Sequence, residues 1–129
     1  MKWLLLFLLT SSQLVLAQHK PSQAYTFVEQ MPELPGGGGN AAIVSAIMKR
    51  LKATKNALDA YRGRPIIYFE VAPTGQVQRV HLTTNSQSAG LDSALLVAAR
   101  TLPKFKPGYH QGRPVTVSFN IPIACIKSQ

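Results

Sequence analysis

Four consecutive glycines, Gly36 to Gly39, stand directly before a stretch with helical spacing. Glycine-rich loops that open helices often hold phosphate groups. A P-loop, however, also needs a strand before the glycines and Gly-Lys-Ser/Thr at the start of the helix. Here Pro35 precedes the glycines and Asn40 follows them. The sequence therefore favours a flexible turn into a helix over a nucleotide site.

Side chains for acid–base, nucleophilic or metal chemistry are few and scattered. The acidic residues are Glu29, Glu33, Asp59, Glu70 and Asp92. No two of them form an obvious catalytic pair. The three histidines, His19, His81 and His110, lack the spacing of metal ligands. We therefore expect no catalytic residue, no metal site and no cofactor, and we set a hydrolytic enzyme aside.

The single cysteine, Cys125, leaves the chain without an internal disulfide. It continues the apolar side of the last predicted strand. Free cysteine is among the most frequently buried residue types, which favours a small buried hydrophobe over the alternative, a reactive nucleophile.

The chain is strongly basic, with 14 Lys and Arg against 5 Asp and Glu and a formal charge of +9. Such a balance suits polyanionic surfaces in general. The best basic patch is residues 104–106, Lys-Phe-Lys, beside Tyr109, His110 and Arg113. No nucleic-acid motif accompanies it, so we do not expect a nucleic-acid partner. Binding of a polyanion or cell-wall polymer remains the alternative function.

The N-terminus has the pattern of an export signal. Residues 1–17, MKWLLLFLLTSSQLVLA, combine a charged start, an apolar run and a small-residue end, which predicts a signal peptide cleaved before Gln18. The alternative is a membrane anchor, but the strongly apolar part is only Trp3 to Leu9, and a span needs about 20 residues. We expect a flexible lead over residues 18–24, no stable anchor after cleavage, and a periplasmic or secreted location.

The first helix is predicted after Gly39, with Asn40 as its N-cap. Ile43, Ile47 and Leu51 recur at four-residue spacing along one face. The preceding segment, AYTFVEQMPELP, alternates weakly and predicts at best a short edge strand.

Residues 64–84, RPIIYFEVAPTGQVQRVHLTT, are typical of a β-hairpin. Residues 73–75 suit a three-residue loop with Gly75 in the left-handed conformation. A β-bulge near Gln78 and Arg79 keeps the apolar side chains on one face. The predicted partners are Val71 with Val77, Phe69 with Val80, Ile67 with Leu82, Glu70 with Arg79, and Tyr68 with His81.

The second helix spans LDSALLVAARTL and is stopped by Pro103. The last strand follows in RPVTVSFNIPIAC, where apolar residues alternate strictly with polar ones. The order helix-strand-strand-helix-strand predicts an α+β fold with two helices packed on one face of a three-stranded antiparallel sheet. IIYFEV becomes the central strand, and the last strand, with Pro114 and Pro122, becomes an edge.

These motifs resemble the C-terminal domain of TonB, the envelope energy transducer of Gram-negative bacteria. MPELPGG resembles the opening of that domain, GRPIIYFEVAPTGQVQRVHL its hairpin, GLDSALLVAARTLPKFKPG its second helix and the turn after it, and GRPVTVSFNIPI its closing strand. The family usually carries Tyr-Pro between the first helix and the hairpin, where this chain reads KATKNALDAY. We expect neither the uncleaved membrane helix nor the Pro-rich spacer of a full transducer in this chain. The resemblance implies a free-standing exported domain over residues 25–126.

The resemblance also implies a function, which is docking of an extended segment of an envelope protein by β-strand addition. A TonB-dependent outer-membrane receptor is the implied partner, and a homodimer is possible. The expected binding residues lie on the last strand: Val115, Thr116, Val117, Ser118, Phe119, Asn120 and Ile121. We expect Thr116, Ser118 and Asn120 to face outward and to select the partner's sequence. The alternative is that this edge is capped, by AYTFVEQ or by a second copy of the domain.

Overall fold

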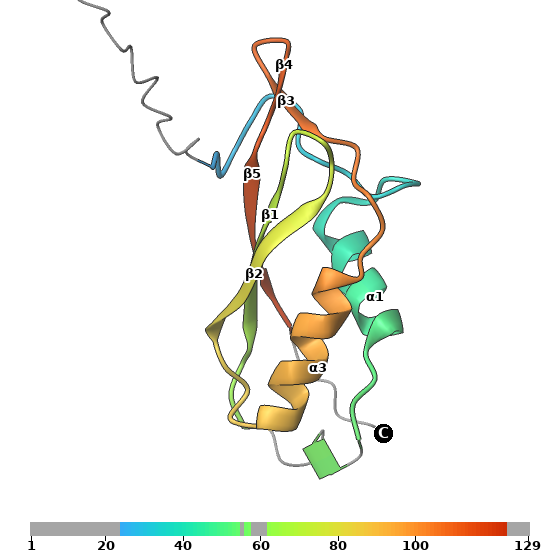
Figure 1. Ribbon diagram of the computed structural model, residues 1–129, viewed down its shortest axis with the longest axis vertical. Helices are drawn as coiled ribbons and strands as arrows, with labels where there is room; N and C mark the ends of the chain where they lie inside the picture. Colours follow the sequence, from blue (N-terminus) through green and yellow to red (C-terminus); the bar gives the residue numbers. More distant parts are fainter. Residues whose placement is uncertain (1–23, 55, 58–61, 124–129) are drawn as a thin grey trace, which may run out of the picture.

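A computed structural model describes residues 24–54, 56–57 and 62–123 (Figure 1). The predicted signal peptide, nearly all of the predicted lead, and Cys125 lie outside the described residues. The elements are α1 (Gly39–Arg50), β1 (Ile66–Val71), β2 (Val77–Thr84), α3 (Ala89–Arg100), β3 (Gly108–His110), β4 (Arg113–Val115) and β5 (Val117–Pro122).

The three long strands form one antiparallel sheet in the order β2-β1-β5. Figure 1 shows α1 and α3 side by side on one face of this sheet. The predicted α+β fold is thus confirmed, with IIYFEV in the centre. Ile67, Phe69 and Val71 on this strand are fully buried, as expected for a strand with a neighbour on each side and a helical layer above it.

The β1–β2 hairpin has the predicted bulge. Val71 lies opposite Val77, Ile67 opposite Leu82 and Tyr68 opposite His81. A register shift falls between Tyr68 and Glu70, and Arg79 takes a left-handed φ of 52° at that point. One detail was wrong: Glu70 lies opposite Gln78, because the extra residue is absorbed at Arg79 itself.

The turn of this hairpin depends on glycine. The N–H of Gly75 donates to the carbonyl of Ala72 at 2.8 Å, and Gly75 has a φ of 89°. A Cβ placed on Gly75 would lie 2.0 Å from the carbonyl oxygen of Phe105. The N–H of Phe105 in turn donates to the carbonyl of Gly75 at 2.8 Å. Only glycine permits this close approach of two backbones.

The last strand is not the single run that its alternation predicts. Residues Arg113–Val115 form β4, which pairs with β3 through Gly108 and Val115, and Thr116 separates β4 from β5. Gln111 and Gly112 connect β3 to β4, with φ values of 53° and 73°. This is the arrangement of a tight two-residue hairpin turn. The alternation continues across the break, so it does not reveal the additional hairpin.

The glycine run has a backbone role. Gly36, Gly37, Gly38 and Gly39 all have positive φ, between 61° and 97°. Side-chain-bearing residues rarely adopt four such conformations in succession, which explains the composition of this turn. The predicted cap was wrong: α1 begins at Gly39, its N-cap is Gly38 in the left-handed conformation, and Asn40 lies within the first turn.

The core lies between the sheet and the helices and contains three aromatic rings. The rings of Phe69 and Phe119 stack with centroids 5.2 Å apart, and Phe105 lies 6.0 Å from Phe69 and 6.2 Å from Phe119. Phe105 belongs to the basic patch of the sequence analysis, but it is buried. Lys104 and Lys106 beside it are exposed, so the aromatic of that patch packs in the core and is not presented to a ligand.

A candidate docking edge on the last strand

Strand β5 is an edge of the sheet. On its inner side it pairs with β1 over its whole length, from Ile66 with Pro122 to Val71 with Val117, without a register shift. On its outer side the chain's own Tyr25 forms a parallel bridge with Val117. The N–H of Tyr25 donates to the carbonyl of Thr116 at 2.9 Å, and the N–H of Ser118 donates to the carbonyl of Tyr25 at 2.8 Å.

These two hydrogen bonds fix the direction of the backbone groups along β5. Because the N–H of Ser118 points outward, strand alternation points the N–H and the carbonyl of Asn120 outward as well. The carbonyl of Pro122 follows the same parity, and proline has no N–H. Within the part of the chain that the structure describes, the outer side of β5 makes no backbone hydrogen bond beyond Ser118.

The predicted binding residues fall into three groups. Val115 lies in β4, paired with Gly108. The side chains of Val117, Phe119 and Ile121 are buried in the core. Thr116, Ser118 and Asn120 were expected to face outward, yet Thr116 is 6% exposed and Ser118 is 8% exposed. Only Asn120 of the seven is exposed.

Residues 24–34, here called the N-terminal strap, explain part of the burial of Thr116 and Ser118. After Tyr25 the strap leaves the β5 edge, with Phe27 81% exposed, and Val28 then enters the core. Further along, Gln30 and Tyr109 exchange backbone hydrogen bonds of 3.1 and 2.9 Å. The ring of Tyr25 lies 5.3 Å from that of His110, whose buried Nδ1 has no hydrogen-bond partner among the described residues. The expected short edge strand is therefore a series of isolated bridges.

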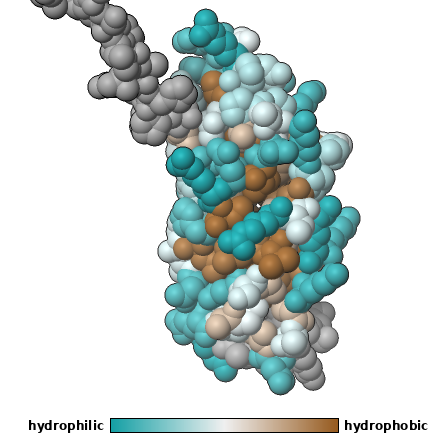
Figure 2. Space-filling view, viewed as in Figure 1, coloured by the Kyte–Doolittle hydropathy of each residue, from teal (hydrophilic) through white to brown (hydrophobic). Residues whose placement is uncertain are grey.

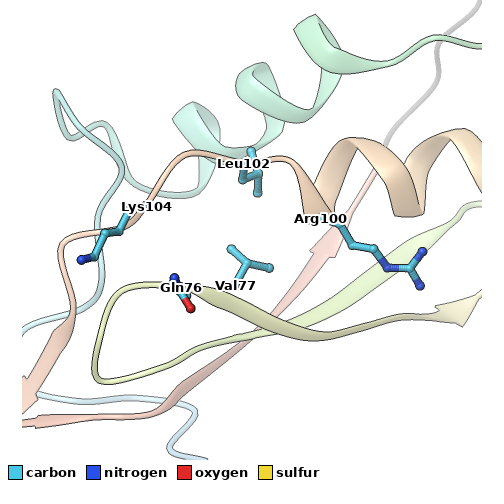
Figure 3. A pocket seen from close by; sticks show the side chains of 5 residues that line it. All are labelled: Gln76, Val77, Arg100, Leu102 and Lys104. Carbon is cyan, nitrogen blue, oxygen red and sulfur yellow. The ribbon is translucent and has the colours of Figure 1, made fainter.

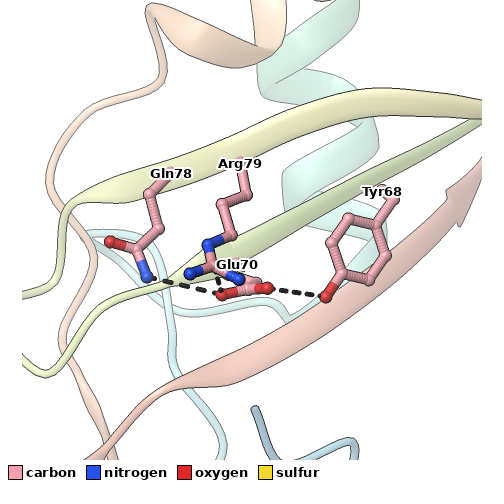
Figure 4. A network of polar contacts seen from close by, with 4 residues as sticks. All are labelled: Tyr68, Glu70, Gln78 and Arg79. Atoms are coloured by element: carbon pink, nitrogen blue, oxygen red, sulfur yellow. Dashed lines mark hydrogen bonds and ion pairs between the residues drawn. The ribbon is translucent and has the colours of Figure 1, made fainter. Parts of the chain in front are cut away.

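A polar network occupies the open face of the sheet, one strand in from the edge (Figure 4). Glu70 is 5% exposed and accepts a hydrogen bond of 2.7 Å from the hydroxyl of Tyr68. Gln78 Nε2 donates to Glu70 Oε1 at 3.4 Å, and Arg79 Nε lies 3.8 Å from the same oxygen. The predicted Glu70–Arg79 ion pair is thus confirmed, although Arg79 is mostly exposed and the pair contributes little stability.

Burial and the neighbouring carboxylate of Glu70 raise the pKa of Tyr68 above its ordinary value. The phenol therefore remains protonated and donates to Glu70 at neutral pH. The ring of His81 stacks on Tyr68 with centroids 4.6 Å apart. This network supplies the buried carboxylate of Glu70 with hydrogen-bond partners. It lies on the central strand β1, next to the β5 edge.

The described residues contain neither a metal-binding cluster nor a membrane-spanning helix. No group of three or more His, Cys, Asp and Glu there is arranged to hold a metal ion. No helix in the same residues is long and apolar enough to cross a membrane.

Comparison with known proteins identifies the family. The sequence pattern described as the Gram-negative bacterial TonB protein C-terminal matches residues 55–124, more than half of the chain. The chain therefore belongs to this family. The match includes β1 to β5 and α3, whereas the N-terminal strap and α1 lie before it. No curated protein and no solved structure matches the chain.

Proposed function

We propose that this member of the TonB C-terminal family docks an extended segment of an outer-membrane transport protein on the outer edge of β5. One observation carries the proposal: the chain's own Tyr25 already makes the two backbone hydrogen bonds of a strand added at this edge. An edge that accepts one extended residue offers the same groups further along.

The docking stretch begins where the N-terminal strap departs. It offers the carbonyl of Ser118, the N–H and carbonyl of Asn120, and the carbonyl of Pro122. Backbone pairing supplies affinity, and the exposed side chain of Asn120 contributes selectivity. Pro122 ends the row of donors because it has no N–H.

The family supplies the class of partner. TonB C-terminal domains are periplasmic, non-enzymatic interaction domains that contact TonB-dependent outer-membrane receptors. The proposal extends docking, and not energy transduction, to this chain. The partner segment adds beyond Tyr25 or displaces it, because Tyr25 already pairs with the carbonyl of Thr116 and the N–H of Ser118.

The test uses two substitutions at one position. Asn120→Pro removes the outward N–H without touching the pairing with β1, so the domain stays folded and docking is lost. Asn120→Ala keeps the N–H and retains docking. The probe is a synthetic peptide copying the periplasm-facing N-terminal segment of a TonB-dependent receptor, titrated by calorimetry. Docking by a folded Asn120→Pro protein at unchanged affinity refutes the mechanism.

Hydrogen exchange of the free protein provides a second test. The amide of Ser118 is protected because it donates to Tyr25, whereas the amide of Asn120 exchanges rapidly. Addition of the receptor peptide slows exchange at Asn120. Slow exchange at Asn120 without peptide indicates a capped edge and contradicts the proposal.

A further inference from the structure

A separate hollow of about 290 Å³ lies at the β2 edge of the sheet, the edge opposite to β5 (Figure 3). It lies between the start of β2 and the C-terminal end of α3, and its lining residues are Gln76, Val77, Arg100, Leu102 and Lys104. Figure 2 shows hydrophobic atoms gathered in the middle of this face, with hydrophilic side chains around and across them. The surface thus combines an apolar centre with a polar rim.

The side chains of the hollow divide by chemistry. Val77 from β2 and Leu102 from the segment after α3 face each other across it, while Arg100 and Lys104 extend at its two ends (Figure 3). Arg100 and Lys104 are exposed, and neither forms an ion pair with a described residue. Among the described residues that line the hollow, none is acidic. The charge that these residues contribute is therefore purely positive.

The backbone beside the hollow is also available. The N–H of Ala72 donates to the carbonyl of Gln76 at 2.9 Å, so Gln76 points its backbone groups toward β1. Alternation then points the N–H and carbonyl of the next residue, Val77, away from β1. Strand β2 is the second edge of the sheet. Val77 can therefore pair with an extended chain lying along the hollow.

We propose that this hollow binds an acidic extended segment of a partner protein, which inserts one apolar side chain between Val77 and Leu102. Two cations without a described partner favour carboxylates on either side of that side chain. The apolar centre favours a peptide over a polyanion with a uniformly charged backbone. The volume is at the lower end for ligand pockets and suits a single side chain.

This site is independent of the β5 edge. The central strand β1 separates β2 from β5, so both edges can be occupied together. The test of this site uses a different probe and different residues from the test of docking on β5.

The experiment titrates the labelled protein with the blocked peptide Asp-Glu-Leu-Glu-Asp and follows backbone NMR signals. We expect shifts centred on Val77 and Leu102. The peptide with Gln in place of Leu should bind about tenfold more weakly, because the apolar side chain is lost. Absence of shifts at Val77 and Leu102, or equal affinity of the two peptides, overturns the proposal.

Charge reversal supplies the matched control. The double variant Arg100→Glu, Lys104→Glu should bind the Leu peptide about tenfold more weakly. The control, Lys52→Glu with Lys106→Glu, makes the same change in net charge at exposed positions outside the hollow. It should change affinity less than about twofold. An equal loss in both folded variants means that affinity follows net charge alone and overturns the site.

Discussion

The two edges of the sheet differ in regularity. Strand β5 pairs with β1 through six consecutive residues without a register shift. The pairing of β2 with β1 is interrupted by two register shifts, one between Ile66 and Ile67 and one between Tyr68 and Glu70. The bulge at Arg79 twists β2, and bulges are a common way to prevent an edge from accepting another strand along its length. The regular edge is suited to recognising backbone. The irregular edge is suited to recognising side chains and charge.

The edges are also protected differently. The start of β5 is covered by Tyr25, and its end carries Asn120 and Pro122. The start of β2 lies against the basic hollow, and its bulge places the mostly exposed Arg79 over the open face. A partner at β5 therefore competes with a segment of the same chain, and a partner at β2 meets cations. This contrast leads to four predictions.

The largest effect is expected from proline on the inner side of β5. Phe119 lies opposite Phe69 with inward backbone groups, so Phe119→Pro removes a ladder hydrogen bond and a core ring. We expect a loss of about 4 kcal/mol or more in the free energy of unfolding. Asn120→Pro should cost about 1 kcal/mol or less, because its N–H points outward. Urea denaturation measures both, and equal costs contradict the assigned direction of the edge.

The next effect concerns the β1–β2 turn, which precedes the residues of the hollow along the chain. Gly75→Ala places a Cβ against the carbonyl of Phe105 and disfavours the left-handed φ, so we expect a loss of about 2–4 kcal/mol. Gly112→Ala is the control, because Gly112 also has a positive φ but nothing lies within 4 Å of its Cβ position. It should cost about 1 kcal/mol. Similar costs for the two changes would mean that contact with Phe105 is unimportant.

Local patterns in the sequence predicted the regular part of this molecule. The nearly continuous apolar run IIYFEV predicted the central strand, the alternation in VSFNIP predicted a strand, and residues 73–75 predicted a tight turn. The bulge followed because both hairpin strands had to keep apolar side chains on the same face. These features depend on nearby residues, so they are visible without the fold.

The features that were missed depend on distant segments. Ser118 has the polar character of an outward residue, yet it is buried where Tyr25 crosses the edge from 93 residues away. The β3–β4 hairpin was missed although Gln111 and Gly112 provide a turn signal, because Val115 and Val117 keep the same parity across the break. The hollow combines β2 with the end of α3, and no local pattern joins them.

A smaller effect is expected from ionic strength, which should lower peptide affinity more at the hollow than at β5. Between about 0.05 and 0.2 M salt, the acidic peptide at the hollow should lose about tenfold in affinity, since its binding depends on exposed charges. The receptor peptide at β5 should lose less than about threefold, since backbone pairing is only weakly screened. Calorimetry at several salt concentrations measures both. A collapse of binding at β5 would favour the alternative of a basic face that binds polyanions.

The smallest effect concerns the network beside the β5 edge. Burial and then Glu70 raise the pKa of Tyr68 above its ordinary value of 10.0. The protonated phenol is therefore favoured in the folded state. This contribution to stability is complete below pH 10.0 and is lost as the pH rises through the folded pKa. Ultraviolet titration of the protein should reveal a phenol that ionises above the ordinary pKa of tyrosine.

Glu70→Gln sharpens this measurement because it removes the negative charge and keeps the shape. The pKa of Tyr68 should fall but remain raised, since burial is the larger cause. The network uses side chains on the open face, where Tyr68 lies opposite Asn120 and Glu70 opposite Ser118, whereas docking uses the outward backbone groups of β5. Docking at β5 should therefore be unchanged in Glu70→Gln. Loss of docking in this variant, with its fold intact, would extend the binding site from the strand edge onto the open face of the sheet.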